Sequence, residues 1–351
     1  MPRKRSPASG PGLEDGLHYA DHAGPGIRRL RCGRGFRYVD AQGRAVRDAA
    51  TLQRIRALAI PPAYKEVWIC ASPRGHLQAV GRDARGRIQY RYHPLWRQRR
   101  DAHKFQRLVA FTHALPALRR CLRRDLALPG LPRDKAIATA VAVLGSTLLR
   151  VGNEAYEREN GSYGLTTLRR RHLRPRGRGL RLCFQGKGGQ DHEVDVDDPR
   201  LVRLLRRMHE LPGQRLFQYR DGEGRLQPVG SADINAYLAQ AMGGEFTAKD
   251  FRTWGATCAA FRLLAALPCP QPCSEAELAR TRNAVIAQVA RLLGNTPAVC
   301  RKSYVDPCLF EGWRDGRLHP AATRARGPRQ WEQCTARFLA RAHRAAMRAA
   351  R

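Results

Sequence analysis

The spacing of hydrophobic residues changes once along this chain of 351 residues, and that change limits the possible folds more than any other feature. Between residues 36 and 92, short β-rich runs alternate with turn residues. Beyond His93 the apolar residues recur at helical spacing, beginning with Leu108, Phe111 and Leu115. We therefore predict the α+β class, with a small, mainly β domain ahead of a mostly α-helical one.

Composition at the two ends of the chain completes the predicted domain organisation. The first residues are rich in Pro, Gly and Ser, which is typical of a flexible tail, and the last are rich in Ala and Arg, which favours a basic helical tail. The boundary between the two domains is expected at residues 95 to 105. We predict a basic tail at 1–26, a β-rich domain at 27–98, a helical domain at 99–320 and a helical tail at 321–351.

Helix signals place three side chains near the ends of regular elements. An amphipathic stripe over residues 137–148 predicts a helix that leads directly into Arg150. A T-x-x-D start signal predicts another helix with Arg252 in its first turns. A further helix is expected to stop at Gly294, and the T-P start signal that follows it opens a helix carrying Tyr304.

A β-hairpin is predicted to interrupt the helical domain. Apolar residues alternate over 180–184 and again over 194–196, on either side of a Gly-rich tip that contains Lys187. A lysine at such a tip is not needed for packing and can reach a ligand. Single arginines are ordinary surface charges in most proteins, and a tyrosine on a helix is most often half-buried, so neither alone indicates a site.

The charge of the chain predicts a polyanionic partner. Lys and Arg number 64 against 30 Asp and Glu, which gives a net charge of +34. Only seven of the 64 are lysine, so 57 are arginine. Arginine binds phosphate oxygens through a bidentate fork and so suits a nucleic-acid backbone. A codon bias would explain the choice of arginine over lysine, but it would not explain the excess over acidic residues.

Several function classes lack their sequence signatures here. There is no P-loop, HExxH, EF-hand loop, DxD cluster or GxSxG elbow, and the ten cysteines show no zinc spacing. The longest apolar run falls short of the ~20 residues that span a membrane, and the basic N-terminus has no apolar secretory core. We therefore expect no cofactor, no metal, no nucleotide and no membrane association, in a cytoplasmic protein.

Six motifs between residues 60 and 304 carry a family resemblance. In order they read IPPAYKEVWI, GRDARGRIQYRYHPLW, LLRVGNEAYERENGSYGLTTLRRRHL, FQGKGGQDHEVD, KDFRTWGA and LLGNTPAVCRKSY. Together they closely resemble the bacterial and poxvirus-like type IB DNA topoisomerases. These enzymes cut one strand of duplex DNA with a tyrosine, form a 3′-phosphotyrosyl link, let the free end rotate and reseal the strand. The resemblance implies a monomer that works on nucleoid DNA without ATP.

The resemblance also assigns catalytic roles. It implies that Tyr304 in RKSY is the nucleophile, that Arg150 and Arg252 are the catalytic arginines, and that Lys187 in QGKGG is the general acid. Asn295 in GNTP takes a position where poxvirus and eukaryotic members carry histidine. Bacterial members resemble this chain in having asparagine there.

These residue types suit the chemistry. A phenol with a pKa of about 10 attacks weakly unless cations stabilise the developing negative charge. An acid that protonates the departing 5′ oxygen adds about 10²- to 10⁴-fold to the rate.

Contacts with DNA are implied at five further positions: Gln89, Tyr90 and Tyr92 in QYRY, Tyr156 in EAYEREN, and Lys249 in KDFR. Tyr90 and Tyr92 are two residues apart on a predicted strand, so their side chains should face the same way. Packing between strands is the alternative role for at least one of these two tyrosines.

Two other function classes remain open from the sequence. Tyrosine recombinases share the Arg, Lys, Arg and Tyr chemistry, but they usually begin the HxxR box with histidine, where this chain has Lys249. A non-enzymatic basic protein that packages DNA would explain the charge but not the ordered motifs.

Overall fold

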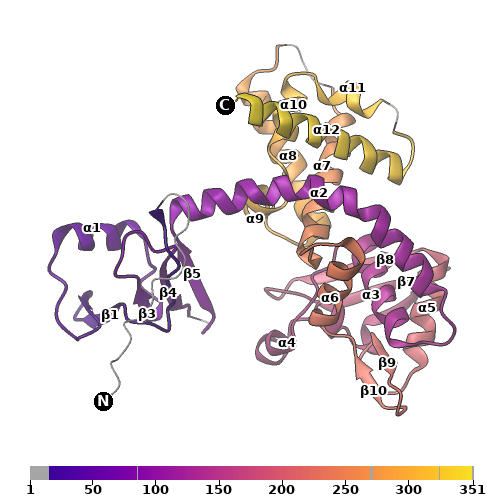
Figure 1. The fold of residues 1–351 in the computed structure, drawn as a ribbon, viewed down its shortest axis with the longest axis horizontal. Coiled ribbons are helices and arrows are strands. Elements are labelled where there is room, and N and C mark those ends of the chain that lie inside the picture. The colour runs from indigo at the N-terminus through magenta and orange to yellow at the C-terminus, as the bar shows by residue number, and fades with distance from the viewer. Residues whose placement is uncertain (1–15, 85, 269–271, 324, 350–351) are drawn as a thin grey trace. The chain divides into compact units, whose positions relative to one another are not determined.

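The computed structural model describes residues 16–84, 86–268, 272–323 and 325–349 (Figure 1). The chain divides into two compact units between Lys104 and Phe105. The first is built on an antiparallel sheet, and the second is mostly helical with two small sheets. The predicted α+β class is therefore confirmed.

The N-terminal unit contains β1 (Ile27–Cys32), β2 (Gly35–Val39), α1 (Ala49–Ala57), β3 (Lys65–Ile69), β4 (Leu77–Arg82) and β5 (Ile88–Tyr92). The strands form one antiparallel sheet in the order β2-β1-β3-β4-β5. Helix α1 packs on it through Ile55, together with Ile27, Val67 and Ile69. Strand β1 was not predicted, because its three arginines hide the apolar alternation.

The sheet unit begins earlier than the predicted end of the N-terminal tail. Leu17 is buried at 3% exposure, and the backbone of His18 bonds to that of Arg74 and His76 at 3.1 and 2.8 Å. The ring of Tyr19 lies edge-on to His76 at 4.8 Å. These contacts fix residues 17–19 on the sheet unit. The tail prediction for residues 1–15 lies outside the described residues.

The C-terminal unit holds most of the helices. Helix α2 (Pro94–Leu126) crosses the division between the units. The other helices are α3 (Arg133–Thr147), α4 (Glu154–Asn160), α5 (Pro199–Glu210), α6 (Ser231–Met242), α7 (Ala248–Ala265), α8 (Glu275–Leu293), α9 (Pro297–Ser303), α10 (Cys308–Arg314), α11 (Leu318–Ala322) and α12 (Pro328–Ala349).

Two small antiparallel sheets accompany these helices. The first consists of β6 (Leu173–Arg176), β7 (Gly179–Gln185) and β8 (Asp191–Val196), and the second of β9 (Gln218–Arg220) and β10 (Leu226–Pro228). Strands β7 and β8 are the predicted hairpin, with Leu182 opposite Val194 and Leu180 opposite Val196.

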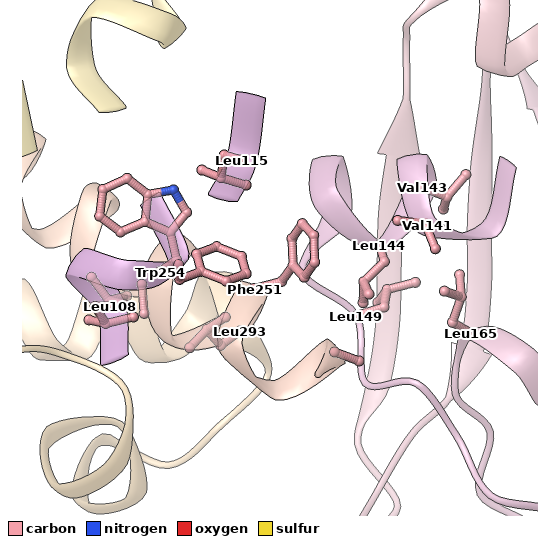
Figure 2. Close-up of a cluster of buried hydrophobic side chains, with 14 of the residues drawn as sticks. Leu108, Leu115, Val141, Val143, Leu144, Leu149, Leu165, Phe251, Trp254 and Leu293 are labelled. Atoms are coloured by element: carbon pink, nitrogen blue, oxygen red, sulfur yellow. The ribbon is translucent and has the colours of Figure 1, made fainter. Parts of the chain in front are cut away.

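A single core joins α2, α3, α7 and α8 (Figure 2). Leu108 and Leu115 of α2 lie beside Trp254 and Phe251 of α7 in this view. Leu144 of α3 is fully buried in the same core. The packing of these side chains holds the helices together, because breaking apolar contacts in a core costs free energy.

The C-terminal end is helical, as the sequence predicts, but it packs as part of this unit. Helix α12 buries Phe338 and Leu339. Phe338 lies 5.7 Å from the ring of Phe261, and a Cβ on Gly312 of α10 would come within 2.2 Å of it. None of the described helices combines the length and apolar character needed to cross a bilayer.

A buried histidine links the three-stranded sheet to the loop before it. His172 is 7% exposed, its Nδ1 accepts a hydrogen bond from the backbone N–H of Arg169 at 3.0 Å, and its ring lies 4.5 Å from that of Tyr163. Burial, and then the charges of Arg171 and Arg169, lower the pKa of His172 to about 4. The folded protein therefore holds this imidazole neutral at pH values where the unfolded chain would protonate it.

We expect the free energy of unfolding to fall as the pH decreases from 6.5 toward 4. The ordinary pKa of histidine is 6.5, so between these values the unfolded chain binds a proton that the folded chain does not. Thermal melts from pH 7.5 to 4.5 measure this effect. His172→Asn keeps an acceptor and cannot be protonated, so its stability should depend less steeply on pH; an unchanged slope would contradict the assignment.

Candidate active site

Arg252 lies at the centre of the candidate site. The predicted T-x-x-D signal is confirmed, because the backbone N–H of Thr247 donates to Asp250 Oδ2 at 2.8 Å where α7 begins. Arg252 follows in the first turns and is 4% exposed. Its Nη1 donates to the carbonyl of Leu148 and its Nη2 to that of Leu293 at 2.9 Å. One buried cation thus caps the C-terminal ends of α3 and α8, where carbonyls lack helical partners.

Arg150 contacts the same end of α8. Helix α3 ends at Leu148 in the left-handed conformation (φ 55°), and Arg150 follows two residues later. Its Nη1 donates to the carbonyl of Gly294 at 3.3 Å, and its Nη2 donates to Asn295 Oδ1. Gly294 ends α8 in the left-handed conformation (φ 57°), as predicted. The sequence-predicted Arg150, Arg252 and Asn295 are therefore brought together.

The backbone at Arg150 is fixed by a close approach of two glycines. The N–H of Leu165 donates to the carbonyl of Arg150 at 2.8 Å. A Cβ on Gly164 would lie 2.6 Å from the Cα of Gly152 and 2.8 Å from that same carbonyl oxygen. Only glycine at position 164 lets these two segments meet, so this packing sets where the side chain of Arg150 starts.

Tyr304 lies beside Arg252. Thr296 caps α9 through its hydroxyl, which accepts from the N–H of Val299 at 3.4 Å. Tyr304 stands at the other end as the C-cap, rather than inside the helix. Its half-buried ring has its centroid 5.3 Å from the Arg252 guanidinium carbon, and Thr257 Oγ1 donates to its carbonyl at 3.1 Å. The predicted nucleophile and one predicted arginine are thus in direct contact.

The electrostatics of this cluster favour an anion. Burial lowers the pKa of Arg252, which neighbouring Tyr304 partly offsets. Burial, and then the charge of Arg252, lower the pKa of Arg150. Among the described residues, Arg252 Nε and Asn295 Nδ2 are buried without a hydrogen-bond partner. Two crowded cations and two unused N–H donors suit a phosphate, whose oxygens would accept from them.

Lys187 lies at the tip of the β7–β8 hairpin, as predicted. The backbone N–H of Gly186 donates to the carbonyl of Gln190 at 2.7 Å, and Gly188 and Gly189 follow in the left-handed region. The lysine is exposed, and its Nζ lies 5.8 Å from the ring centroid of Tyr156. The structure thus places Lys187 against Tyr156 of α4.

The helix that carries Tyr156 is anchored by a buried acid. Glu157, the neighbour of Tyr156, is buried and pairs with Arg215 at 2.6 Å and Arg169 at 3.0 Å. Burial alone would raise the pKa of Glu157, but hydrogen bonds from Arg215 and Arg169 outweigh it and lower the pKa. Tyr156 is also among the groups that raise the pKa of Arg150 against the larger effect of burial.

His192 is a site residue that the sequence reasoning missed. It lies opposite Phe184 in the hairpin, and the two rings stack at 5.1 Å with an interplanar angle of 8°. Burial, then Arg150 and then Arg252, lower its pKa. A signal existed, because His192 shares a strand face with Val194 and Val196 and is the polar residue in that row.

The predicted DNA contacts of the N-terminal unit lie on β5. Tyr90 is 44% exposed and stacks on Tyr92 with ring centroids 6.1 Å apart, so the two do face the same way. Gln89 donates to Asp83 Oδ2 at 3.0 Å. In the other unit, Lys249 is exposed at the start of α7. Their contacts with DNA stay a prediction.

Within the described residues, one group could supply three metal ligands: Asp306, Cys308 and His343. The carboxylate of Asp306 already accepts from His343 Nε2 at 2.8 Å and from the Cys308 backbone N–H at 3.0 Å. These hydrogen bonds connect α12 to the segment directly after Tyr304. They explain why the three side chains lie close together without a bound ion.

Comparison with known proteins agrees with this geometry. Residues 94–308 match the family described as eukaryotic DNA topoisomerase I, catalytic core, and residues 35–83 match bacterial DNA topoisomerase IB, N-terminal domain. DNA topoisomerase 1B of Acanthamoeba polyphaga mimivirus is 33% identical over 289 residues, 81% of this chain and 86% of that protein. The chain belongs to the type IB DNA topoisomerases. Vaccinia virus (strain Copenhagen) DNA topoisomerase 1B is 23% identical over 260 residues, 72% of this chain and 76% of the relative.

Membership confirms the resemblance drawn from the motifs. The chain is an isomerase, and the family implies a DNA substrate that is relaxed. The matched range of the catalytic core, residues 94–308, contains Arg150, Lys187, Arg252, Asn295 and Tyr304.

We expect Gly164→Ala to destabilise this topoisomerase and to displace Arg150. The added methyl would meet backbone atoms at 2.6 to 2.8 Å, and overpacking of this kind costs ~1–3 kcal/mol. Urea unfolding measures the loss, and DNA cleavage should slow beyond what the stability loss explains. Gly222→Ala is the matched control, because a Cβ there meets nothing within 4 Å. Equal behaviour of the two variants would rule out the constraint.

Proposed function

We propose that this enzyme relaxes supercoiled duplex DNA through a covalent 3′-phosphotyrosyl intermediate on Tyr304, without ATP or an obligatory metal. One observation carries the proposal: the Tyr304 ring lies 5.3 Å from the Arg252 guanidinium, whose Nη2 bonds to the end of α8 that Arg150 also contacts. A phenol and two arginines directed at one place form a site for a tyrosine nucleophile and a phosphodiester.

The proposed step exchanges one phosphodiester for another. The phenolic oxygen of Tyr304 attacks the scissile phosphorus, the bond from phosphorus to the 5′ oxygen breaks, and Lys187 donates a proton to that oxygen. The proton of the phenol passes to solvent. Because the bond energy is kept in the tyrosyl ester, the freed 5′ hydroxyl can attack it after rotation and reseal the strand without a nucleotide.

Arg150, Arg252 and Asn295 stabilise the charge that develops on the nonbridging oxygens. Arg252 Nε and Asn295 Nδ2 are the buried donors that this charge would satisfy. A preorganised donor of this kind is worth about 10²- to 10³-fold in rate. Asn295 contributes a hydrogen bond but neither a full charge nor a proton.

Duplex DNA is the proposed partner of both units, bound by a monomer in the cytoplasm. Tyr90 and Tyr92 of β5, with Gln89, would contact it from the sheet unit, and Tyr156 and Lys249 from the catalytic unit. The match of residues 35–83 to a topoisomerase N-terminal domain supports this reading over a tyrosine recombinase.

Tyr304→Phe should abolish relaxation of supercoiled plasmid while leaving DNA affinity nearly unchanged. The phenyl ring keeps the packing beside Arg252 but has no oxygen to attack phosphorus. The assay is plasmid relaxation in EDTA without ATP, with DNA binding measured in parallel by a mobility shift. The wild-type chain should relax the plasmid under these conditions. Relaxation by the variant, or a wild-type requirement for ATP or a divalent metal, would overturn the proposal.

Lys187→Ala should cleave DNA about 10²- to 10⁴-fold more slowly, which is the usual contribution of a general acid. A substrate with sulfur in place of the bridging 5′ oxygen should restore most of the rate, because a thiolate leaves without protonation. Single-turnover cleavage of both substrates makes the test. Lys302→Ala provides a lysine control on α9. A variant equally slow on both substrates would remove Lys187 from the acid role.

A further inference from the structure

The imidazole of His192 fills the space that two glycines leave open. A Cβ on Gly186 would lie 2.5 Å from His192 Cδ2, and a Cβ on Gly294 would lie 2.1 Å from His192 Cε1. The ring is also stacked on Phe184 of the same hairpin at 5.1 Å. His192 is therefore wedged between the base of the hairpin tip and the end of α8.

These two glycines adjoin the reacting groups. Gly186 directly precedes Lys187, and the carbonyl of Gly294 accepts from Arg150 at 3.3 Å. Beyond His192 the tip is open, since a Cβ on Gly188 or Gly189 would meet nothing within 4 Å. The imidazole is thus a fixed contact between the loop that carries the proposed acid and the helix end that binds the arginines.

The charges around His192 favour a neutral ring. Phe184 covers one face, and burial, Arg150 and Arg252 lower its pKa, with Asp191 opposing them. A protonated ring would add a third cation beside two guanidiniums. A neutral, flat and polarisable ring can occupy this gap without that repulsion.

We propose that His192 is a positioning residue for Lys187, acting as a spacer that fixes the hairpin tip relative to the phosphate-binding end of α8. This inference rests on the proposed function. The ring does not touch the reacting atoms; it sets how far the ammonium of Lys187 lies from the leaving 5′ oxygen. Its shape, rather than its capacity to bind a proton, is what the enzyme uses.

The test compares His192→Ala and His192→Phe in single-turnover cleavage of oxygen- and sulfur-bridged substrates. The alanine variant should cleave the oxygen substrate about 10- to 100-fold more slowly, because a displacement near 1 Å costs up to about 10² in rate. It should cleave the sulfur substrate at close to the wild-type rate, since that substrate needs no acid. Phenylalanine, which keeps a ring in the gap, should recover most of the loss. His113→Ala, an exposed histidine of α2, is the matched control.

Three results would overturn the inference. They are a wild-type rate for His192→Ala on the oxygen substrate, an equal loss on both substrates, or a phenylalanine variant as slow as alanine. Sulfur rescue of Lys187→Ala and inactivity of Tyr304→Phe in the same experiments would leave the proposed function standing, so the two failures are distinguishable.

A second pair of variants tests the same contact from the glycine side, and its first member does not depend on how His192→Ala folds. Gly186→Ala alone would drive its methyl group into the imidazole and should slow cleavage of the oxygen substrate. Combining it with His192→Ala removes the clash, so the double variant should cleave faster than the product of the two single losses predicts. Simple additivity of the two losses would contradict the wedge.

Discussion

The catalytic unit depends on the hydrogen bonds of one buried guanidinium. Arg252 donates to the last carbonyl of α8 and to the carbonyl of Leu148 at the end of α3, two positions where carbonyls lack partners within the helix. A buried cation requires such acceptors, and the two helix ends carry partial negative charge. The hydrogen bonds with which Arg252 caps two helix ends therefore also place its positive charge beside Tyr304. Stability and the proposed catalysis share this residue.

Lys187, the proposed acid, lies at an exposed loop, whereas Arg252 is buried. Three other site residues come just after buried core residues. Arg150 follows Leu149, Arg252 follows Phe251, and Asn295 comes two residues after Leu293. Figure 2 shows these three apolar side chains within the core. Lys187 instead stands at a glycine-rich tip, where a Cβ on Gly188 or Gly189 would meet nothing within 4 Å. Groups that stabilise charge gain most from rigidity, because their preorganisation lowers the reorganisation cost. An acid that must reach a leaving oxygen can tolerate a looser support, provided that its base is fixed.

Local signals in the sequence predicted the elements well, and non-local contacts explain what it missed. The starts of α7 and α9 and the stop at Gly294 depend on residues within one turn of each other, and the β7–β8 hairpin depends on two neighbouring strands. All of these predictions are confirmed. The burial of Arg252 depends on carbonyls 104 and 41 residues away, so the local start signal that put it in the first turns of α7 could not reveal it. His192 was missed for the same reason, since its gap is formed by Gly186 and Gly294 together.

The surroundings of Asn295 give a physical reason for an amide at this position. Its Oδ1 accepts from Arg150 while Nδ2 remains a buried donor without a partner among the described residues. A histidine there would lie beside the same two guanidiniums that, after burial, lower the pKa of His192. These positive charges would disfavour the protonated form of such an imidazole, and its neutral ring, like the amide, has an N–H to donate. Asparagine supplies that donor at every pH and adds no charge to a site that already crowds two cations.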